Sequence, residues 1–157
     1  MFVVAPQGKA AVKEGAFPAG KEGALLSKMI AGGFKLEESE LFVTPAVKCA
    51  VDLKGPLPRR ARVCCGYITA RQAELLAPRA VVAMGPDAAR VMSRTDKPLG
   101  LLRGRLRKLA AGQWKAWLWT TYGLDRMCAK QGVKEDAWDD LAALAQWLRQ
   151  PPGAPQP

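Results

Sequence analysis

The sequence predicts an α/β protein with a three-layer α/β/α arrangement around a central four-stranded, mainly parallel sheet. Short apolar runs alternate with segments of helical periodicity along the chain, which is typical of this class. The run from Ala80 to Ala83 is unbroken and contains two adjacent valines, as in strands buried on both faces. Gly85 then begins a turn, and Pro86 and Asp87 suit the first turn of a helix. A unit of this kind either forms the crevice in which α/β proteins place ligands or is purely structural.

The N-terminal half is expected to supply two strands and two helices. Phe2 to Ala5 forms the first apolar run and predicts a strand. From Lys21 to Ala31, leucine, methionine and isoleucine recur at helical spacing until a pair of glycines ends the pattern. A second strand is expected over Leu41–Thr44. A basic helix is expected over Arg59–Leu76, and Pro78 ends it.

The C-terminal half is expected to supply the last strand and the last helix. The strand falls within Trp114–Tyr122, with its centre at Ala116–Thr121, and the helix spans Glu135–Leu148. Residues 1–150 are expected to form a single domain. Residues 151–157 are rich in proline and are expected to form a flexible tail.

The whole net charge of +10 arises between Lys54 and Lys108. This segment holds 13 lysine and arginine residues against three acidic ones, and the rest of the chain is balanced. Charge concentrated in one third of a chain favours a polyanionic partner, with nucleic acid first. The alternative is an arginine-rich surface that is simply solvated.

The sequence predicts neither membrane association nor secretion. No apolar run approaches the roughly 20 residues that a membrane-spanning helix needs. The first residues, MFVVAPQGK, lack the pattern of a signal peptide, so a cytoplasmic location is expected. Structural disulfides are not expected there. The chain has no histidine, which excludes Ser/His/Asp triads, Cys/His dyads and most catalytic zinc sites.

Several ordered segments together indicate a family. In chain order they are VVAPQG (3–8), GAFPAGKEGALL (15–26), LFVTPAVKC (41–49), the stretch from Cys64 to Ala89, and RGR (103–105), followed by the last strand. Their order and spacing resemble the uracil-DNA glycosylase superfamily, in particular its thermostable iron–sulfur branch, often called family four. The resemblance covers the chain from Val3 to about Leu148 and implies that family's α/β/α fold.

The resemblance also implies an active site that has lost its chemistry. Members of the family flip uracil out of DNA and hydrolyse its glycosidic bond, with an activated water and a donor for the leaving base. The water-orienting acidic position falls on Ala5, and the stacking aromatic falls on Pro18. The base-reading asparagine falls on Pro45, and the histidine falls on Gly123. The expected function is therefore a catalytically inactive, DNA-binding or scaffolding subunit in replication or repair, a redeployment known in the superfamily.

Two alternatives remain at this stage. An active glycosylase with altered residues or base specificity would need a carboxylate near the pocket, and the local candidates are Glu14, Glu22 and Asp125. Asp125 is the preferred one because it lies in the segment that replaces the family's histidine motif. The other alternative is a protein-interaction module that does not contact nucleic acid.

No cofactor is expected. The family's four-iron cluster uses four cysteines, and only Cys49 and Cys64 fall on ligand positions; the sequence contains no CxxC pair. Two thiolates cannot complete such a site, although Cys65 and Cys128 are further thiols. Cys49 and Cys64 are therefore expected to be vestigial, buried thiols.

The expected partner is DNA, with a replication or repair protein as a second candidate partner. Basic side chains suited to phosphates and the segment that enters DNA in the relatives form the expected interface. These residues are Arg59, Arg60, Arg62, Arg103, Arg105, Arg107, Lys108, Leu124 and Arg126.

Overall fold

A five-stranded mixed sheet forms the centre of the protein. The computed structural model describes residues 1–6, 18–34, 40–49, 57–111 and 114–150. The strand order is β2-β1-β3-β5-β4, and every neighbouring pair is parallel except β4 and β5. The strands are β1 (Phe2–Val4), β2 (Val43–Pro45), β3 (Ala80–Met84), β4 (Arg107–Ala111) and β5 (Trp114–Thr121).

The expected sheet lacked strand β4. It lies at the edge of the sheet and pairs with β5 in antiparallel register, with Arg107 opposite Leu118 and Lys108 opposite Trp117. An edge strand has one hydrogen-bonded neighbour and tolerates charged residues that a central strand excludes. The basic sequence of β4 lacks the apolar pattern by which strands are recognised. This is why the sequence predicted four strands, whereas the sheet has five.

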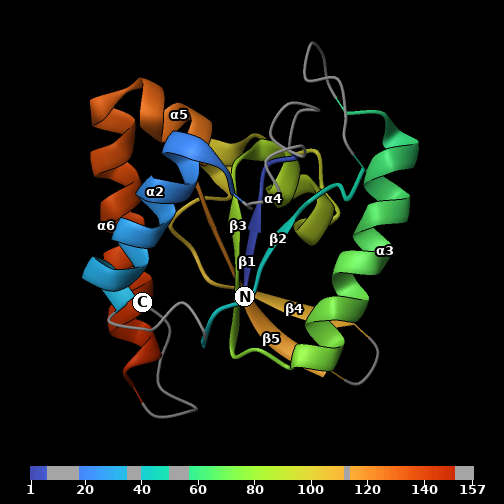
Figure 1. Ribbon diagram of the computed structural model, residues 1–157. Coiled ribbons are helices and arrows are strands. Elements are labelled where there is room, and N and C mark those ends of the chain that lie inside the picture. Colours follow the sequence, from blue (N-terminus) through green and yellow to red (C-terminus); the bar gives the residue numbers. More distant parts are fainter. Residues whose placement is uncertain (7–17, 35–39, 50–56, 112–113, 151–157) are drawn as a thin grey trace.

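Helices cover both faces of the sheet, which confirms the three-layer arrangement (Figure 1). One layer contains α2 (Gly20–Met29), the π-helical turn η1 (Ile30–Phe34), α5 (Leu124–Ala129) and α6 (Gln131–Leu148). The other layer contains α3 (Arg59–Leu76) and α4 (Pro86–Ser93). A short 3₁₀ turn, η3 (Leu99–Leu101), leads towards β4.

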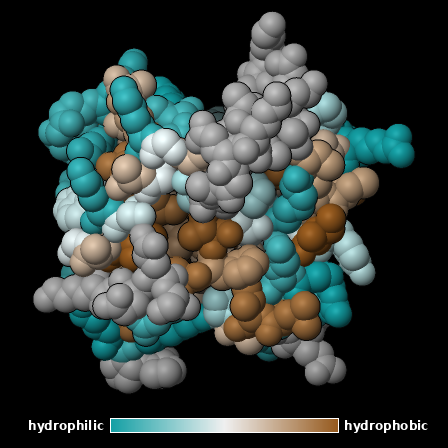
Figure 2. Space-filling view, viewed as in Figure 1, coloured by the Kyte–Doolittle hydropathy of each residue, from teal (hydrophilic) through white to brown (hydrophobic). Residues whose placement is uncertain are grey.

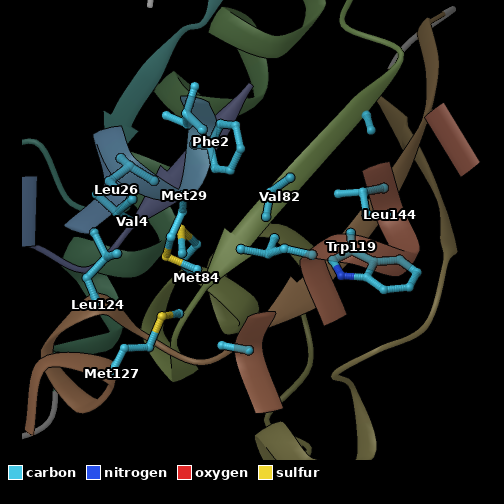
Figure 3. Close-up of a cluster of buried hydrophobic side chains, with 14 of the residues drawn as sticks. Phe2, Val4, Leu26, Met29, Val82, Met84, Trp119, Leu124, Met127 and Leu144 are labelled. Atoms are coloured by element: carbon cyan, nitrogen blue, oxygen red, sulfur yellow. The ribbon is translucent and has the colours of Figure 1, made fainter. Parts of the chain in front are cut away.

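The two sides of the sheet carry cores of different character. Side chains alternate along each strand, so Phe2, Val82 and Trp119 face the layer of α2, α5 and α6 (Figure 3). The opposite side is built of smaller residues, such as Val81 and Ala83, against α3 and α4. The bulkier core lies on the side where α6 packs.

Helix α3 is held by a narrow stripe and leaves much of its surface uncovered. Only Cys65, Thr69 and Ala73 are buried along its length. Hydrophobic atoms gather over its C-terminal end, at the lower right of Figure 2, where Leu75 is 78% exposed. This apolar surface is unusual because charged side chains normally cover the outer face of such a helix.

The element boundaries agree with expectation for α3 and differ elsewhere. The second strand runs two residues later at its start than expected, α6 begins at Gln131, and the short helix α5 was not anticipated. None of the helices in the described ranges is long and apolar enough to cross a membrane. The expected tail at residues 151–157 lies outside the described residues.

Candidate functional site

The carboxyl ends of the parallel strands meet at one edge of the sheet, at the top of Figure 1. The N–H of Ala46 donates to the Val4 carbonyl at 2.9 Å, which holds the ends of β1 and β2 together. The N–H of Gly85 donates to the Thr121 carbonyl at the same distance, which joins the ends of β3 and β5. In open α/β sheets this edge is where ligands bind.

Three of the four positions that the resemblance assigns to catalysis lie at this edge. Ala5 follows β1, Pro45 ends β2, and Gly123 lies two residues after the end of β5. Ala5 has only a methyl group, and Pro45 has neither a side-chain amide nor a backbone N–H. The edge thus has the geometry of a site but lacks polar groups at these positions.

Gly123 lies where a side chain has little room. It is the N-cap of α5, and a Cβ placed on it would overlap Oδ1 of Asp125. The neighbouring Gly85 has φ +92°, a conformation that favours glycine, and a Cβ on it would lie 3.2 Å from Cα of Gly123. A side chain at position 123 would therefore require the Asp125 carboxylate to turn away.

Pro18 lies against the start of α2. A Cβ on Gly23 would overlap the carbonyl oxygen of Pro18, so the loop can approach the helix this closely only because residue 23 is glycine. Pro18 is half-buried and offers a pyrrolidine ring in place of a flat aromatic face. Phe17, the neighbouring aromatic residue in the sequence, lies outside the described residues.

Two carboxylates lie near each other beside this edge. Glu22, in the first turn of α2, and Asp125, in the first turn of α5, interact electrostatically. Burial, and then the negative charge of Asp125, raise the pKa of Glu22 above its ordinary value. Asp125 itself is exposed, and Glu14 lies outside the described residues. Of the three candidate carboxylates, Glu22 and Asp125 are therefore the two that lie within the described ranges.

Arg103 is engaged inside the protein. Its Nε donates to Oδ2 of Asp140 at 3.1 Å, and its guanidinium lies 4.6 Å from the centre of the Tyr122 ring. Asp140 is 8% exposed and also accepts a hydrogen bond from Thr121 Oγ1 at 2.7 Å. Burial raises the pKa of Asp140, while Thr121 and Arg103 oppose that change. The RGR segment is thus a turn anchored on α6, and Arg105 is its exposed arginine.

Some of the other predicted interface residues are exposed, and others are buried or already bonded to neighbouring residues. Leu124 is 2% exposed and belongs to the same core cluster as Met84 (Figure 3). Of the two predicted interface residues on α5, Arg126 is therefore the exposed one. Arg62 forms an ion pair with Asp96 at 2.8 Å, and Arg107 donates from Nη2 to the Leu101 carbonyl at 3.0 Å. The exposed basic residues are Arg59, Arg60, Arg105, Lys108 and Arg126.

A basic groove runs between α3, α4 and β4, and we call it the α3–α4 groove. It consists of two adjoining hollows of about 490 and 310 Å³ that share Gly66, Val91 and Arg94. The sequence predicted part of its basic lining but missed Tyr67, Arg90 and Arg94. The spacing of Arg90 and Arg94, one helical turn apart, was the available signal. Its lining is Arg59, Arg62, Val63, Gly66, Tyr67, Ala70, Arg90, Val91, Met92, Ser93, Arg94, Thr95, Asp96, Arg107, Lys108, Leu109 and Leu118.

The cysteines do not fit a four-cysteine iron–sulfur site. Cys49 and Cys64 are exposed, contrary to the expectation that both are buried, and the buried thiol is Cys65. Cys65 Sγ accepts the backbone N–H of Lys48 at 3.4 Å. Cys128 is on α5, across the sheet from α3. Within the described ranges, no three cysteine or acidic side chains are grouped so that they could hold a metal ion.

A comparison with known protein families agrees with this architecture. Residues 4–142 match the family described as the Uracil DNA glycosylase superfamily. The match covers strands β2 to β5, the last residue of β1, the strand-end positions, the α3–α4 groove and most of α6. The chain therefore belongs to the uracil DNA glycosylase superfamily.

Proposed function

We propose that this chain is a catalytically inactive member of the superfamily that binds DNA and serves as a DNA-binding or scaffolding subunit in replication or repair. We place it nearest to the iron–sulfur branch, with a degenerate site. The observation that supports this most is the strand-end edge itself. Ala5, Pro45 and Gly123 stand there without a polar side chain, and Gly123 is covered by the carboxylate of Asp125.

Excision of uracil needs groups that these residues do not supply. One group reads the edge of the base, a second holds the water, and a third stabilises the anion that leaves. Loss of a single charge-stabilising donor costs about 10²–10³ in rate, or about 2.7–4 kcal/mol. Such losses do not add simply, but the absence of all three leaves no route to useful turnover.

Binding to DNA rests on the exposed basic residues. Arg59 and Arg60 begin α3, and Arg126 is on α5, so three of them lie on elements that start at the strand-end edge (Figure 1). Phosphates bind such side chains with release of counterions, which makes affinity fall steeply as salt rises.

The experiment measures the affinity for duplex DNA as a function of salt concentration. We expect affinity to fall linearly on logarithmic axes, and Arg126→Ala to reduce the steepness by about one unit. Leu75→Ala is a control variant because Leu75 is exposed and uncharged. Binding that is absent at low salt would contradict the proposal and favour a protein-interaction module.

A second function is supported by the carboxylate pair. Burial, and then the charge of Asp125, raise the pKa of Glu22, which favours Glu22 as the acid of the pair. Two carboxylates in different environments can divide acid and base roles in this way. An altered glycosylase would use this pair on a different base. Abasic sites that form in DNA with damaged bases, and that disappear in both Glu22→Gln and Asp125→Asn, would support it. Equal activity in Asp139→Asn, an exposed aspartate on α6, is the control.

A further inference from the structure

We propose that the α3–α4 groove binds single-stranded nucleic acid, with Tyr67 as a stacking surface for a base and Arg59 and Arg94 as phosphate contacts. This inference rests on the proposed DNA-binding function and assigns the ligand class to a surface other than the strand-end edge itself. The strand-end edge lies where the parallel strands stop, whereas the groove runs along the outer layer of helices and reaches β4.

The groove is continuous and long enough for several nucleotides. Its two hollows meet at Gly66, Val91 and Arg94. Along α3, the lining extends from Arg59 to Ala70, which is about 16 Å at the rise of an α-helix.

The charge of the groove matches a phosphate backbone. Six basic side chains line it, against Asp96 as the acidic one in its lining. Asp96 is highly exposed and engages Arg62 at 2.8 Å and Arg90 at 3.9 Å. Exposed ion pairs of this kind are weak, so a phosphate can replace the carboxylate. The ion pairs formed among the described residues leave out both Arg59 and Arg94.

Arg94 is held in an unfavourable backbone conformation. It caps α4 with φ 52°, in the left-handed region that glycine occupies at lower cost. Its exposed side chain lines both hollows. Strained residues of this kind concentrate at functional sites, and Arg94 lines both hollows of the groove, so a role in binding would explain why the strained position carries arginine.

The groove also presents an aromatic ring to solvent. Tyr67 is 70% exposed and Val63, one turn earlier on α3, is 64% exposed. Bases of a single strand can stack on such a ring, whereas the bases of a duplex are already stacked on one another. Arginine and an open aromatic side chain together are typical of surfaces that bind single strands without regard to sequence. An acidic peptide would use the charges but has less need of the ring.

Gly66 keeps the floor of the groove open. Glycine is unfavourable in the interior of a helix. A Cβ at this position would lie 3.5 Å from Val91 Cγ1, an ordinary contact, so packing does not require glycine here. A larger side chain at position 66 would fill the floor without changing the charge.

The test is fluorescence anisotropy of a labelled oligothymidylate of about 15 nucleotides, with a duplex that carries the same label measured in parallel. We expect Tyr67→Ala to weaken binding of the single strand about five- to hundredfold and Tyr67→Phe to retain it. Gly66→Leu should weaken it as well, and Arg94→Ala should lower the salt slope by about one unit. Leu75→Ala, on the same helix but outside the groove, should bind as the wild type does.

The outcomes separate this inference from the proposed function. If the wild type binds DNA but Tyr67→Ala, Gly66→Leu and Arg94→Ala all bind the single strand unchanged, the groove assignment is wrong and the proposed function stands. If the wild type binds neither form of DNA, both are wrong. Binding of a polyglutamate peptide that is lost in Tyr67→Ala, with no binding of the oligonucleotide, would overturn the inference in favour of an acidic protein partner. Thermal melting of each variant confirms that it is folded.

Discussion

Gly85 and Gly123 pack backbone against backbone just beyond the ends of the neighbouring strands β3 and β5. A Cβ on Gly85 would lie 3.2 Å from Cα of Gly123, and the Gly85 N–H donates to the Thr121 carbonyl at 2.9 Å. Strands β3 and β5 are neighbours in the sheet, so this approach closes the centre of the strand-end edge. The position that the resemblance assigns to a histidine is thus occupied by a structural contact.

Replacement of Gly85 by alanine should destabilise the fold. The residue has φ +92°, which is strained for any residue with a side chain, and the added Cβ would make a tight contact of 3.2 Å with Cα of Gly123. We expect Gly85→Ala to lower the free energy of unfolding by about 1–3 kcal/mol, measured by urea denaturation. Gly132→Ala is the control, because a Cβ there meets open space in α6. A Gly85→Ala protein as stable as the wild type would show that the strand ends do not approach so closely.

The interaction of Arg103 with Asp140 should contribute to stability more than to DNA binding. Removal of the carboxylate leaves a half-buried guanidinium and the Thr121 hydroxyl without their acceptor. We expect Asp140→Ala to lower the free energy of unfolding by about 2–4 kcal/mol. Asp139→Ala, at an exposed position of the same helix, should stay within about 0.5 kcal/mol of wild type. Equal stability of the two variants would contradict this account of Arg103.

Lys48 should make stability depend on alkaline pH. Burial lowers the pKa of its ammonium to about 8, although Nζ donates to Thr44 Oγ1 and to the Pro45 carbonyl at 2.6 Å each. The unfolded chain keeps an ordinary lysine pKa, so it binds more protons than the folded chain in the range between the two values. The free energy of unfolding should therefore gain a favourable contribution as pH rises from about 8 to 10.5.

Chemical denaturation across that pH range, in wild type and in Lys48→Met, measures the contribution. The difference between the two proteins should grow in favour of wild type as pH rises. A difference that is independent of pH would show that Lys48 titrates as an ordinary lysine.

Gly66→Ala should stabilise the protein. Alanine is a better helix former than glycine by about 0.8–1 kcal/mol, and the added Cβ makes only an ordinary contact with Val91. We expect the free energy of unfolding to rise by about 0.5–1 kcal/mol. Gly23→Ala offers the opposite case on α2, because its Cβ would overlap the Pro18 carbonyl. Equal losses of stability in both variants would contradict this prediction, because they would show that a Cβ at position 66 clashes with its surroundings.

Local patterns were enough to predict the core of the fold. The apolar run at Ala80–Ala83 and the Pro86 and Asp87 signals led to β3 and α4, and the basic helix α3 was predicted at its observed bounds. Strand β4 was missed because an edge strand needs little apolar sequence. Helix α5 was missed because a helix of six residues is too short for its apolar residues to show a helical repeat.

The candidate site was harder to predict because its contacts are long-range. The sequence predicts Arg103 as a phosphate contact, whereas in the structure it binds Asp140, which lies 37 residues away in the chain. The sequence predicts Leu124 as part of the DNA interface, whereas the structure buries its side chain in the core. The α3–α4 groove depends on where a helix, a second helix and an edge strand meet, and no single segment encodes that arrangement.

The release of uracil from DNA tests the central claim most directly. The protein, in large excess over single- or double-stranded DNA that contains uracil, is incubated, and abasic sites are then cleaved with alkali. We predict no abasic sites above the background of a protein-free control, while the same preparation binds the DNA at low salt. Abasic sites that form in proportion to the protein, and that disappear in Asp125→Ala, would contradict the account and show an active glycosylase.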